Sequence, residues 1–341
     1  MCRRLQLACL LTAALAMSPT AAAKSGTSWA QAELRAVVSA GLMTGEAAAR
    51  PNDPLTRAEL ETLAAGLFRA DPVTPAAPSA PVSISALDAR LVTALGLTDS
   101  ARALTDNARA AGLSPPSRFG TEVLARLLGL RTNHPAALDR LELSPGEAAT
   151  HAEAAFSATR IMRLAEWDPM PTQELAATFL LPRLTAWQKR ILATATRFIG
   201  YPYVWGGESE FRRSPFGTQP HGGFDCSGFV WRVYKLQTYP SEGTLADTLQ
   251  GRTTYAMSGE VAPAKRIAFA DLQPADVIFF GARGSNSTPA QVNHVGIYVG
   301  GGWFIHSSGY GVAVTPLSGW YAQRFAWARR PLAEAGLVSA S

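Results

Sequence analysis

The stretch GGFDCSGFV at residues 222–230 constrains this chain more than any other. It places Cys226 where a glycine-rich turn runs into an apolar segment that is typical of a helix. The other two cysteines, Cys2 and Cys9, lie in a stretch typical of a signal peptide, so the mature chain would offer Cys226 no disulfide partner. A lone thiol in an exported protein is either a small buried hydrophobe or a nucleophile.

The N-terminus carries the three parts of an export signal. Arg3 and Arg4 supply a positive start, residues 5–17 form a short apolar run, and the alanines at 21–23 provide a cleavage site. We therefore expect residues 1–23 to be a signal peptide and the mature protein to be secreted or held in the cell envelope.

Charge and hydropathy exclude two classes of partner. The formal net charge of +5 is small and scattered along the chain, which argues against nucleic-acid binding. No stretch is long and apolar enough for a membrane span, since the run at 5–17 is too short to cross a bilayer comfortably. We expect neither a nucleic-acid partner nor a transmembrane segment.

The first half of the chain has helical periodicity. Residues 28–68 predict a helix that ends at Gly41, a turn, and a second helix. Thr56 and Glu59 have the spacing of a capping box, which places the start of the second helix at this point.

Two weaker copies of this unit follow. The Pro/Ala/Ser-rich residues 72–83 predict an exposed linker, after which the pattern returns around 119–128 and again over 143–167. Each unit is too small to bury its own helix face, so three units over 28–168 are expected to pack on one another.

The unit resembles the S-layer homology repeat, in which Trp29, a helix and then Thr-Arg-Ala-Glu at 56–59 follow in order. The resemblance implies helical hairpins that hold a protein to a cell-wall polysaccharide, with Arg57 as a contact to the anionic sugar. Phe119-Gly120 and His151 stand at the corresponding positions of the other copies. The alternative is a helical spacer that packs on the second half of the chain.

The second half begins after a proline-punctuated connector at 169–184. Thr185 and Gln188 form another capping box, and the helix that they open stops at Gly200. An aromatic turn at 201–207 and a polar, basic insertion at 208–223 separate this helix from the Cys226 segment, which is expected to be helical to about Leu236.

Short β-rich runs then replace the helical pattern. They lie at 277–280, 294–299, 303–306, 311–314 and 325–329, with Gly300-Gly301-Gly302 as a hairpin turn. Helices followed by a series of antiparallel strands predict an α+β domain over 185–333, with a tail at 334–341. Alternation along the strand places His294, Gly296 and Tyr298 on one face of the sheet.

This arrangement can supply the groups that a thiol nucleophile needs. A thiol reacts as its thiolate, and the start of a helix or a cationic partner stabilises that anion at Cys226. His294 would be the general base, and His306, across the hairpin, would orient its ring. The backbone N–H of Cys226 and the hydroxyl of Tyr203 could stabilise an oxyanion.

A family resemblance rests on five motifs in order, namely PYVWGG at 202–207, DCSGFV at 225–230, LQPADVIFF at 272–280, HVGIYVG at 294–300 and FIHS at 304–307. Together they resemble the NlpC family of papain-like cell-wall cysteine peptidases. The resemblance covers about 185–330. It implies a papain-like fold, a Cys226–His294–His306 triad, and cleavage of peptidoglycan stem peptides, commonly between D-glutamate and the diamino acid. No cofactor is implied.

The motifs also suggest which residues contact the substrate, and where this chain departs from the family. Tyr203, Trp205, Asp225 and Ser227 are candidates for the oxyanion and substrate contacts. Ala275 replaces the usual glycine of a Pro-Gly-Asp turn, from which we expect little effect. The insertion at 208–223 is longer than is common and is expected to reshape the substrate groove.

Three alternatives stay open on sequence alone. An acyltransferase or amidase could use the same triad. A wall-binding protein could carry a catalytic domain that is occluded by the insertion or by the N-terminal repeats. A zinc site built from Cys226, His294, His306 and His221 is the metal alternative, although the chain lacks the paired cysteines or closely spaced histidines of most zinc sites.

Overall fold

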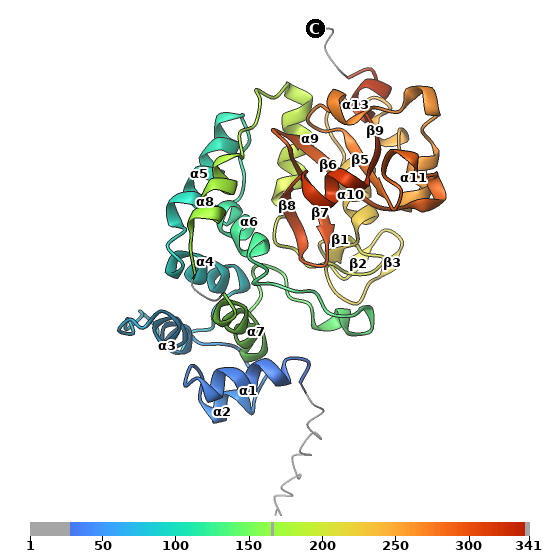
Figure 1. Cartoon of the computed structure of the whole chain (residues 1–341). Coiled ribbons are helices and arrows are strands. Elements are labelled where there is room, and N and C mark those ends of the chain that lie inside the picture. The colour runs from blue at the N-terminus through green and yellow to red at the C-terminus, as the bar shows by residue number, and fades with distance from the viewer. Residues whose placement is uncertain (1–27, 165–166, 338–341) are drawn as a thin grey trace, which may run out of the picture.

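The computed structural model describes residues 28–164 and 167–337 and shows an N-terminal helical region beside a C-terminal region of helices and sheet (Figure 1). The expected signal peptide at 1–23, with Cys2 and Cys9, lies outside the described residues. Within the described part of the chain, no helix has both the length and the apolar character needed to cross a membrane.

The N-terminal region is built from short helices, several of which have a side-chain cap at their start. As predicted, Thr56 and Glu59 form a capping box at the start of the second predicted helix. The helices are α1 (Gln31–Ser39), α2 (Gly45–Ala48), α3 (Arg57–Phe68), α4 (Ile84–Ala94), α5 (Thr98–Ala110), α6 (Phe119–Leu127), the 3₁₀ helix η1 (Ala136–Leu141) and α7 (His151–Met162).

Three of these helices start around a closed ring of backbone hydrogen bonds. The Leu55 N–H donates to the Ala149 carbonyl at 2.7 Å, and the Ala149 N–H donates to the Val82 carbonyl at 2.8 Å. The Val82 N–H donates to the Leu55 carbonyl at 2.9 Å and closes the ring. The residue after each member caps α3, α4 or α7, so the ring joins three helix starts that lie far apart in the sequence.

The ring corrects the position of the second predicted copy. Residues 119–122 do open a helix, α6. The residue equivalent to Thr56, however, is Ser83, because each follows a member of the ring and caps a helix, and Ser83 caps α4. Most of the predicted linker 72–83 is exposed as expected, whereas Val82 is 3% exposed. Sequence composition missed this because one buried apolar residue at the end of a Pro/Ala/Ser stretch carries no periodic signal.

Close packing of α5 on α6 explains Gly120. A Cβ atom at this position would lie 1.8 Å from the carbonyl oxygen of Ala101, which is backbone and cannot turn aside. Gly120 therefore allows the two helices to approach each other, and its place in the sequence reflects this contact.

The predicted connector at 169–184 contains a further helix, α8 (Met170–Ala177), which packs on α5. Pro171 lies in its first turn, where a missing N–H removes no intrahelical hydrogen bond. Proline in this segment therefore marks the start of a helix as well as the irregular chain after it.

The C-terminal region confirms the predicted α+β class. Five antiparallel strands form one sheet in the order β8-β7-β6-β5-β9. The strands are β5 (Val277–Gly281), β6 (Val292–Gly300), β7 (Trp303–Ser308), β8 (Gly311–Pro316) and β9 (Phe325–Arg329), and the helices are α9 (Ala186–Arg197), α10 (Cys226–Tyr234), α11 (Thr254–Gly259), α12 (Gly319–Arg324) and α13 (Pro331–Glu334).

The sheet separates two apolar clusters. Val277 and Phe279 of β5 belong to the large core shared with the helices, whereas Ile278 and Phe280 belong to a smaller cluster on the other face. In the pairing of β5 with β6, Phe280 lies opposite His294 and Ile278 lies opposite Gly296. The predicted common face for His294 and Gly296 is therefore the face of this smaller cluster.

The insertion at 208–223 folds as two short strand pairs. Strand β1 (Glu208–Ser209) pairs with β4 (Gly223–Phe224), and β2 (Arg213–Ser214) pairs with β3 (Gly217–Thr218). The insertion is thus an ordered hairpin that leads directly into α10.

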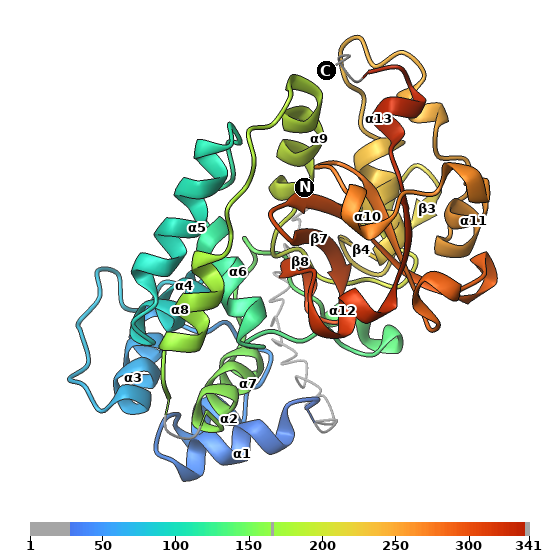
Figure 2. The same cartoon turned by 45° about the horizontal axis from the view of Figure 1, so that its top comes forward.

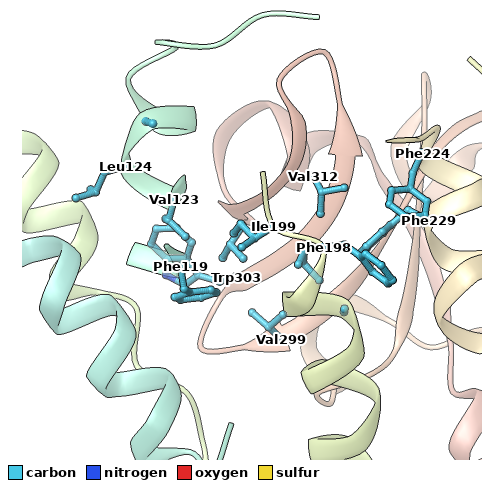
Figure 3. Close-up of a cluster of buried hydrophobic side chains, with 14 of the residues drawn as sticks. Phe119, Val123, Leu124, Phe198, Ile199, Phe224, Phe229, Val299, Trp303 and Val312 are labelled. Carbon is cyan, nitrogen blue, oxygen red and sulfur yellow. The ribbon is translucent and has the colours of Figure 1, made fainter. Parts of the chain in front are cut away.

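The two regions share one apolar core (Figure 3). Phe119 of α6 lies 6.0 Å from Phe179, between ring centroids, and Phe179 lies 5.4 Å from Trp303 of β7. Arg126 adds a buried polar contact, since its guanidinium donates to the Gly200 carbonyl at 2.9 Å. The helical region is therefore packed against the start of the catalytic half.

Two details of the C-terminal region differ from expectation. Ala275 has φ 72°, in the left-handed region that favours glycine, so its replacement of glycine costs about 1 kcal/mol and is not neutral. The predicted tail starts inside α13, because Glu334 pairs with the buried guanidinium of Arg329.

Candidate active site

Cys226 is the first residue of α10, as the sequence predicts. Asp225 caps this helix by accepting the Gly228 N–H, and its Oδ1 also accepts the Ser227 hydroxyl at 3.0 Å. A Cβ atom on Gly228 would lie 1.9 Å from the Gly207 carbonyl oxygen. Glycine therefore lets α10 approach the aromatic turn that precedes the insertion.

The Cys226 thiol is 9% exposed and lies against β6. Burial raises its pKa to about 12, and the charge of Asp225 adds to this, while the N–H groups of Val295 and Ser227 act in the opposite direction. Burial therefore opposes the stabilisation of the thiolate that is expected from the helix start. The contact with Val295 places the sulfur beside the residue that follows His294.

A hydrogen-bonded relay links His294 to the two neighbouring strands. The Nε2 atom of His294 lies 2.8 Å from Nδ1 of His306, and Nε2 of His306 lies 3.1 Å from Oγ1 of Thr315. Because Nε2 of His294 is engaged, its Nδ1 is the nitrogen left to accept a proton from a nucleophile. Thr315, on β8, is a member of this relay that sequence reasoning missed.

Aromatic rings hold the two imidazoles in place. The rings of Phe304 and His306 stack with centroids 4.4 Å apart, and Tyr321 of α12 lies edge-on to His306 at 5.2 Å. Burial lowers the pKa of His294 to about 4 and lowers that of His306 well below its usual range. Burial therefore favours the neutral form of both imidazoles, which is the form that can accept a proton.

Tyr203 and Trp205 lie where the aromatic turn meets the site. Burial and the nearby Cys226 and Asp225 raise the pKa of Tyr203, so its hydroxyl keeps its proton and can donate to an oxyanion. Trp205 is 71% exposed, and its backbone N–H donates to Oδ2 of Asp139 at 2.8 Å.

Arg252 organises the start of α10 and was missed by the sequence reasoning. Its guanidinium contacts Glu208 at 2.9 Å, Oδ1 of Asp225 at 3.1 Å and the Ser227 hydroxyl at 2.8 Å. It also donates to the carbonyls of Gly206 and Gly207. A single arginine twenty-six positions after the nucleophile carries no local signal, so only the fold reveals this role.

Two cavities are lined by the candidate residues around Cys226. The cavity on the His294 side has a volume of about 500 Å³ and includes Tyr203, Trp205 and Tyr321 in its lining. The cavity on the Asp225 side has a volume of about 770 Å³ and is lined in part by Ser227, Arg252 and Phe216 of the insertion. Trp205 lines both cavities, and we refer to the two together as the active-site groove.

Each cavity has a wall from outside the catalytic motifs. Residues 133–139, in the segment between α6 and α7, line the His294 side, and the Asn133 N–H donates to the Gly309 carbonyl at 3.0 Å. In Figures 1 and 2 this green segment reaches beneath the sheet to the ends of the strands. The expectation that the insertion shapes the groove applies to one side; the N-terminal region shapes the other.

The remaining candidate residues lie elsewhere. His221 of the insertion pairs with Glu147 of the N-terminal region at 3.0 Å, and Arg57 is exposed on α3 and donates to the Ala76 carbonyl. His151 is buried 3.3 Å from Glu59. Within residues 28–164 and 167–337, no three His, Cys, Asp or Glu side chains gather as metal ligands, so His221 does not join the triad in a zinc site.

Comparison with known proteins places the motifs in a family. Residues 200–330 match the model of the NlpC/P60 family, which confirms the expected domain over this range. The chain is 31% identical to the gamma-D-glutamyl-L-lysine dipeptidyl-peptidase of Bacillus subtilis over 38% of this chain and 34% of that protein. It is 36% identical to the murein DD-endopeptidase MepH of Escherichia coli over 39% of this chain and 41% of that protein.

The family match does not extend to the N-terminal region. The matched relatives share 34% and 41% of their own length with this chain, so well under half of each is covered. A solved NlpC/P60 family protein from Bacillus cereus is 28% identical with a TM-score of 0.33, over 46% of this chain and 43% of that one.

Proposed function

We propose that this chain is an exported cysteine endopeptidase that cleaves amide bonds in the stem peptides of peptidoglycan. The observation that carries the proposal is the relay of His294, His306 and Thr315, together with a thiol at the start of α10 whose sulfur contacts the backbone of Val295, next to His294. The similarity to relatives named as peptidoglycan peptidases supports the substrate class.

The proposed reaction uses these residues in turn. The Cys226 sulfur attacks the amide carbonyl while Nδ1 of His294 accepts the thiol proton, and His306 holds the imidazolium in place. The Cys226 N–H and the Tyr203 hydroxyl stabilise the oxyanion. His294 then protonates the leaving amine, and water, activated by the same imidazole, hydrolyses the thioester.

The names of the two relatives refer to two different bonds, and we propose that this chain cleaves one of them. The gamma-D-glutamyl-L-lysine peptidase of Bacillus subtilis is the relative that agrees with the bond implied by the motifs. We therefore place the scissile bond between D-glutamate and the diamino acid of the stem peptide.

The N-terminal region carries a second part of the proposal. Three helix starts meet in the ring of Leu55, Val82 and Ala149, and the exposed guanidinium of Arg57 stands at the first of them. We propose that this region binds an anionic cell-wall polysaccharide through Arg57. Sedimentation of Arg57→Ala with purified cell walls should show weaker binding than the parent, whereas equal binding would remove Arg57 from the interaction.

Product analysis tests the proposed reaction. The mature protein and Cys226→Ala are each incubated with a stem tripeptide of L-alanine, γ-linked D-glutamate and a diamino acid, and the products are read by mass spectrometry. We expect release of the diamino acid with the parent alone. Transfer of the acyl group to an added amine instead of water would identify an acyltransferase. Binding of the peptide without products would indicate an occluded site.

A further inference from the structure

The mechanism assigns the two cavities to different parts of the substrate. His294 must protonate the leaving amine, so the diamino acid that carries this amine lies on the His294 side of the sulfur. Asp225 and Ser227 line the other cavity, which therefore receives the acyl part. This assignment rests on the proposed function.

The cavity on the His294 side has the lining of a cation site. Among its described lining residues Asp139 is the one carboxylate, and none is a lysine or arginine. The exposed ring of Trp205 and the ring of Trp320 form part of its surface. Trp320 already accepts a cation, since the guanidinium of Arg324 lies 4.5 Å from its ring centroid.

Asp139 has an oxygen available for a ligand. It lies on η1 of the N-terminal region, and its Oδ2 accepts the Trp205 N–H. The hydrogen bonds within the described residues do not engage Oδ1, and this atom is not sealed in the interior as the carboxylate oxygens of Asp88 and Glu122 are. Asp139 lines the cavity although it is only 2% exposed, and burial raises the pKa of its carboxyl. One oxygen therefore anchors the aromatic turn, and the other has no hydrogen bond within the described residues.

We propose that Asp139 is a specificity residue that binds the side-chain ammonium of the diamino acid in the leaving group. The exposed face of Trp205 supplies a second, cation–π contact. A charge-assisted hydrogen bond in a half-enclosed cavity selects an ammonium-bearing side chain over an apolar one of equal length. The N-terminal region would thus take part in substrate recognition, and the protein's specificity would depend on docking of residues 133–139.

A purely structural role is the competing explanation, since Asp139 also anchors Trp205. Asp139→Asn separates the two roles. An asparagine side chain keeps an oxygen that can accept the Trp205 N–H but removes the charge that an ammonium requires. Asp106→Asn, at an exposed position on α5, is the matched control for the loss of one acidic charge.

The test compares two stem tripeptides. The first ends in the diamino acid that the parent releases, L-lysine or meso-diaminopimelate, and the second ends in the same residue without its side-chain ammonium, norleucine or 2-aminopimelate. For the parent and for Asp106→Asn we expect kcat/KM to favour the first peptide by about tenfold, the size of one charge-assisted hydrogen bond. For Asp139→Asn we expect this ratio to fall to about one through loss on the first peptide alone.

The outcomes that contradict the specificity proposal can be told apart from those that contradict the proposed function. An equal loss on both peptides in Asp139→Asn would show that Asp139 only holds Trp205, and a parent without preference would also overturn the proposal. A parent that cleaves neither peptide overturns the proposed function, and the specificity with it. Thermal unfolding of Asp139→Asn within a few degrees of the parent ensures that a changed ratio reports recognition.

Discussion

The two ends of the active-site groove are built in different ways. At the Asp225 end, Arg252 ties together Glu208, Asp225 and the carbonyls of the aromatic turn, and all of these groups come from the catalytic half. At the His294 end, the wall at 133–139 comes from the N-terminal region and is held by contacts with Trp205 and Gly309. One end is intrinsic to the catalytic domain, whereas the other exists only when the two regions are docked.

This difference separates chemistry from recognition. The residues to which we assign the chemistry lie within the matched range 200–330, and so do Arg252 and the groups that it contacts. The wall of the His294 end lies outside that range. Relatives that share the domain but carry a different N-terminal region can therefore keep the reaction and differ in what binds on the leaving-group side.

The largest effect is expected at the relay, which serves both ends of the groove. His306→Ala removes the group that orients His294, and we expect kcat to fall roughly 10²–10⁴-fold with both cavities intact. Thr315→Val should have a smaller effect, about tenfold, because it removes only the acceptor for His306. Steady-state kinetics on the stem tripeptide measures both. An unchanged kcat in His306→Ala would show that His306 does not contribute to catalysis.

The next largest effect is expected from a substitution that disrupts the Asp225 end alone. Arg252→Met leaves the carboxylates of Glu208 and Asp225, with side chains 6% and 14% exposed, without their cation. We expect the free energy of unfolding to fall by about 3 kcal/mol, measured by urea denaturation. The exposed Arg102→Met on α5 is the control and should change stability by about 0.5 kcal/mol or less.

If the two ends are independent, Arg252→Met should lower activity on the two tripeptides of the specificity test by the same factor. A selective loss on the peptide with the ammonium would show that the Asp225 end also takes part in recognition of the leaving group. That result would contradict the separation of the two ends.

A smaller effect is expected from a change in the packing of α5 on α6, the helix that precedes the wall at 133–139. Gly120→Ala places a Cβ atom against the Ala101 carbonyl, so α5 and α6 must separate. We expect a loss of about 2 kcal/mol in the free energy of unfolding. Gly146→Ala, whose Cβ atom would meet nothing within 4 Å, should be close to neutral. Equal stabilities of the two variants would mean that α6 can shift without cost.

The smallest effect concerns the pair of His221 and Glu147, which links the insertion to the N-terminal region. Glu147 raises the pKa of His221, so the stabilisation is present below the ordinary value of 6.5 and is lost as pH rises through the raised pKa. His221 lowers the pKa of Glu147, so this carboxylate stays charged until the pH falls well into the acid range. The pair should therefore contribute most near pH 5–6.

Glu147→Gln measures this contribution. Because the Glu147 side chain is 47% exposed, solvent screening limits the effect to less than about 1 kcal/mol. We expect the variant to be less stable than the parent at pH 5.5 and equal to it at pH 8.5 in urea denaturation. A difference that is larger at pH 8.5 would contradict the assignment of a charged His221.

Features encoded over a few neighbouring residues could be predicted from the sequence. The capping boxes at Thr56 and Thr185 and the helix start at Cys226 follow from local spacing, and the structure has all three. Long-range features could not be predicted. The ring that includes Val82, the relay partner Thr315 and the anchor Arg252 depend on segments that meet only after folding.

The sequence by itself determined the α+β class of the C-terminal half, the helix that begins at Cys226 and the strands that carry His294 and His306, because caps, turns and alternation act over short distances. Tertiary structure alone decided how deeply the thiol is buried, which acts against the helix start on its pKa, and it decided what encloses the groove. Desolvation and docking sum over contacts between distant segments, so no local pattern records that the segment from 133 to 139 faces His294.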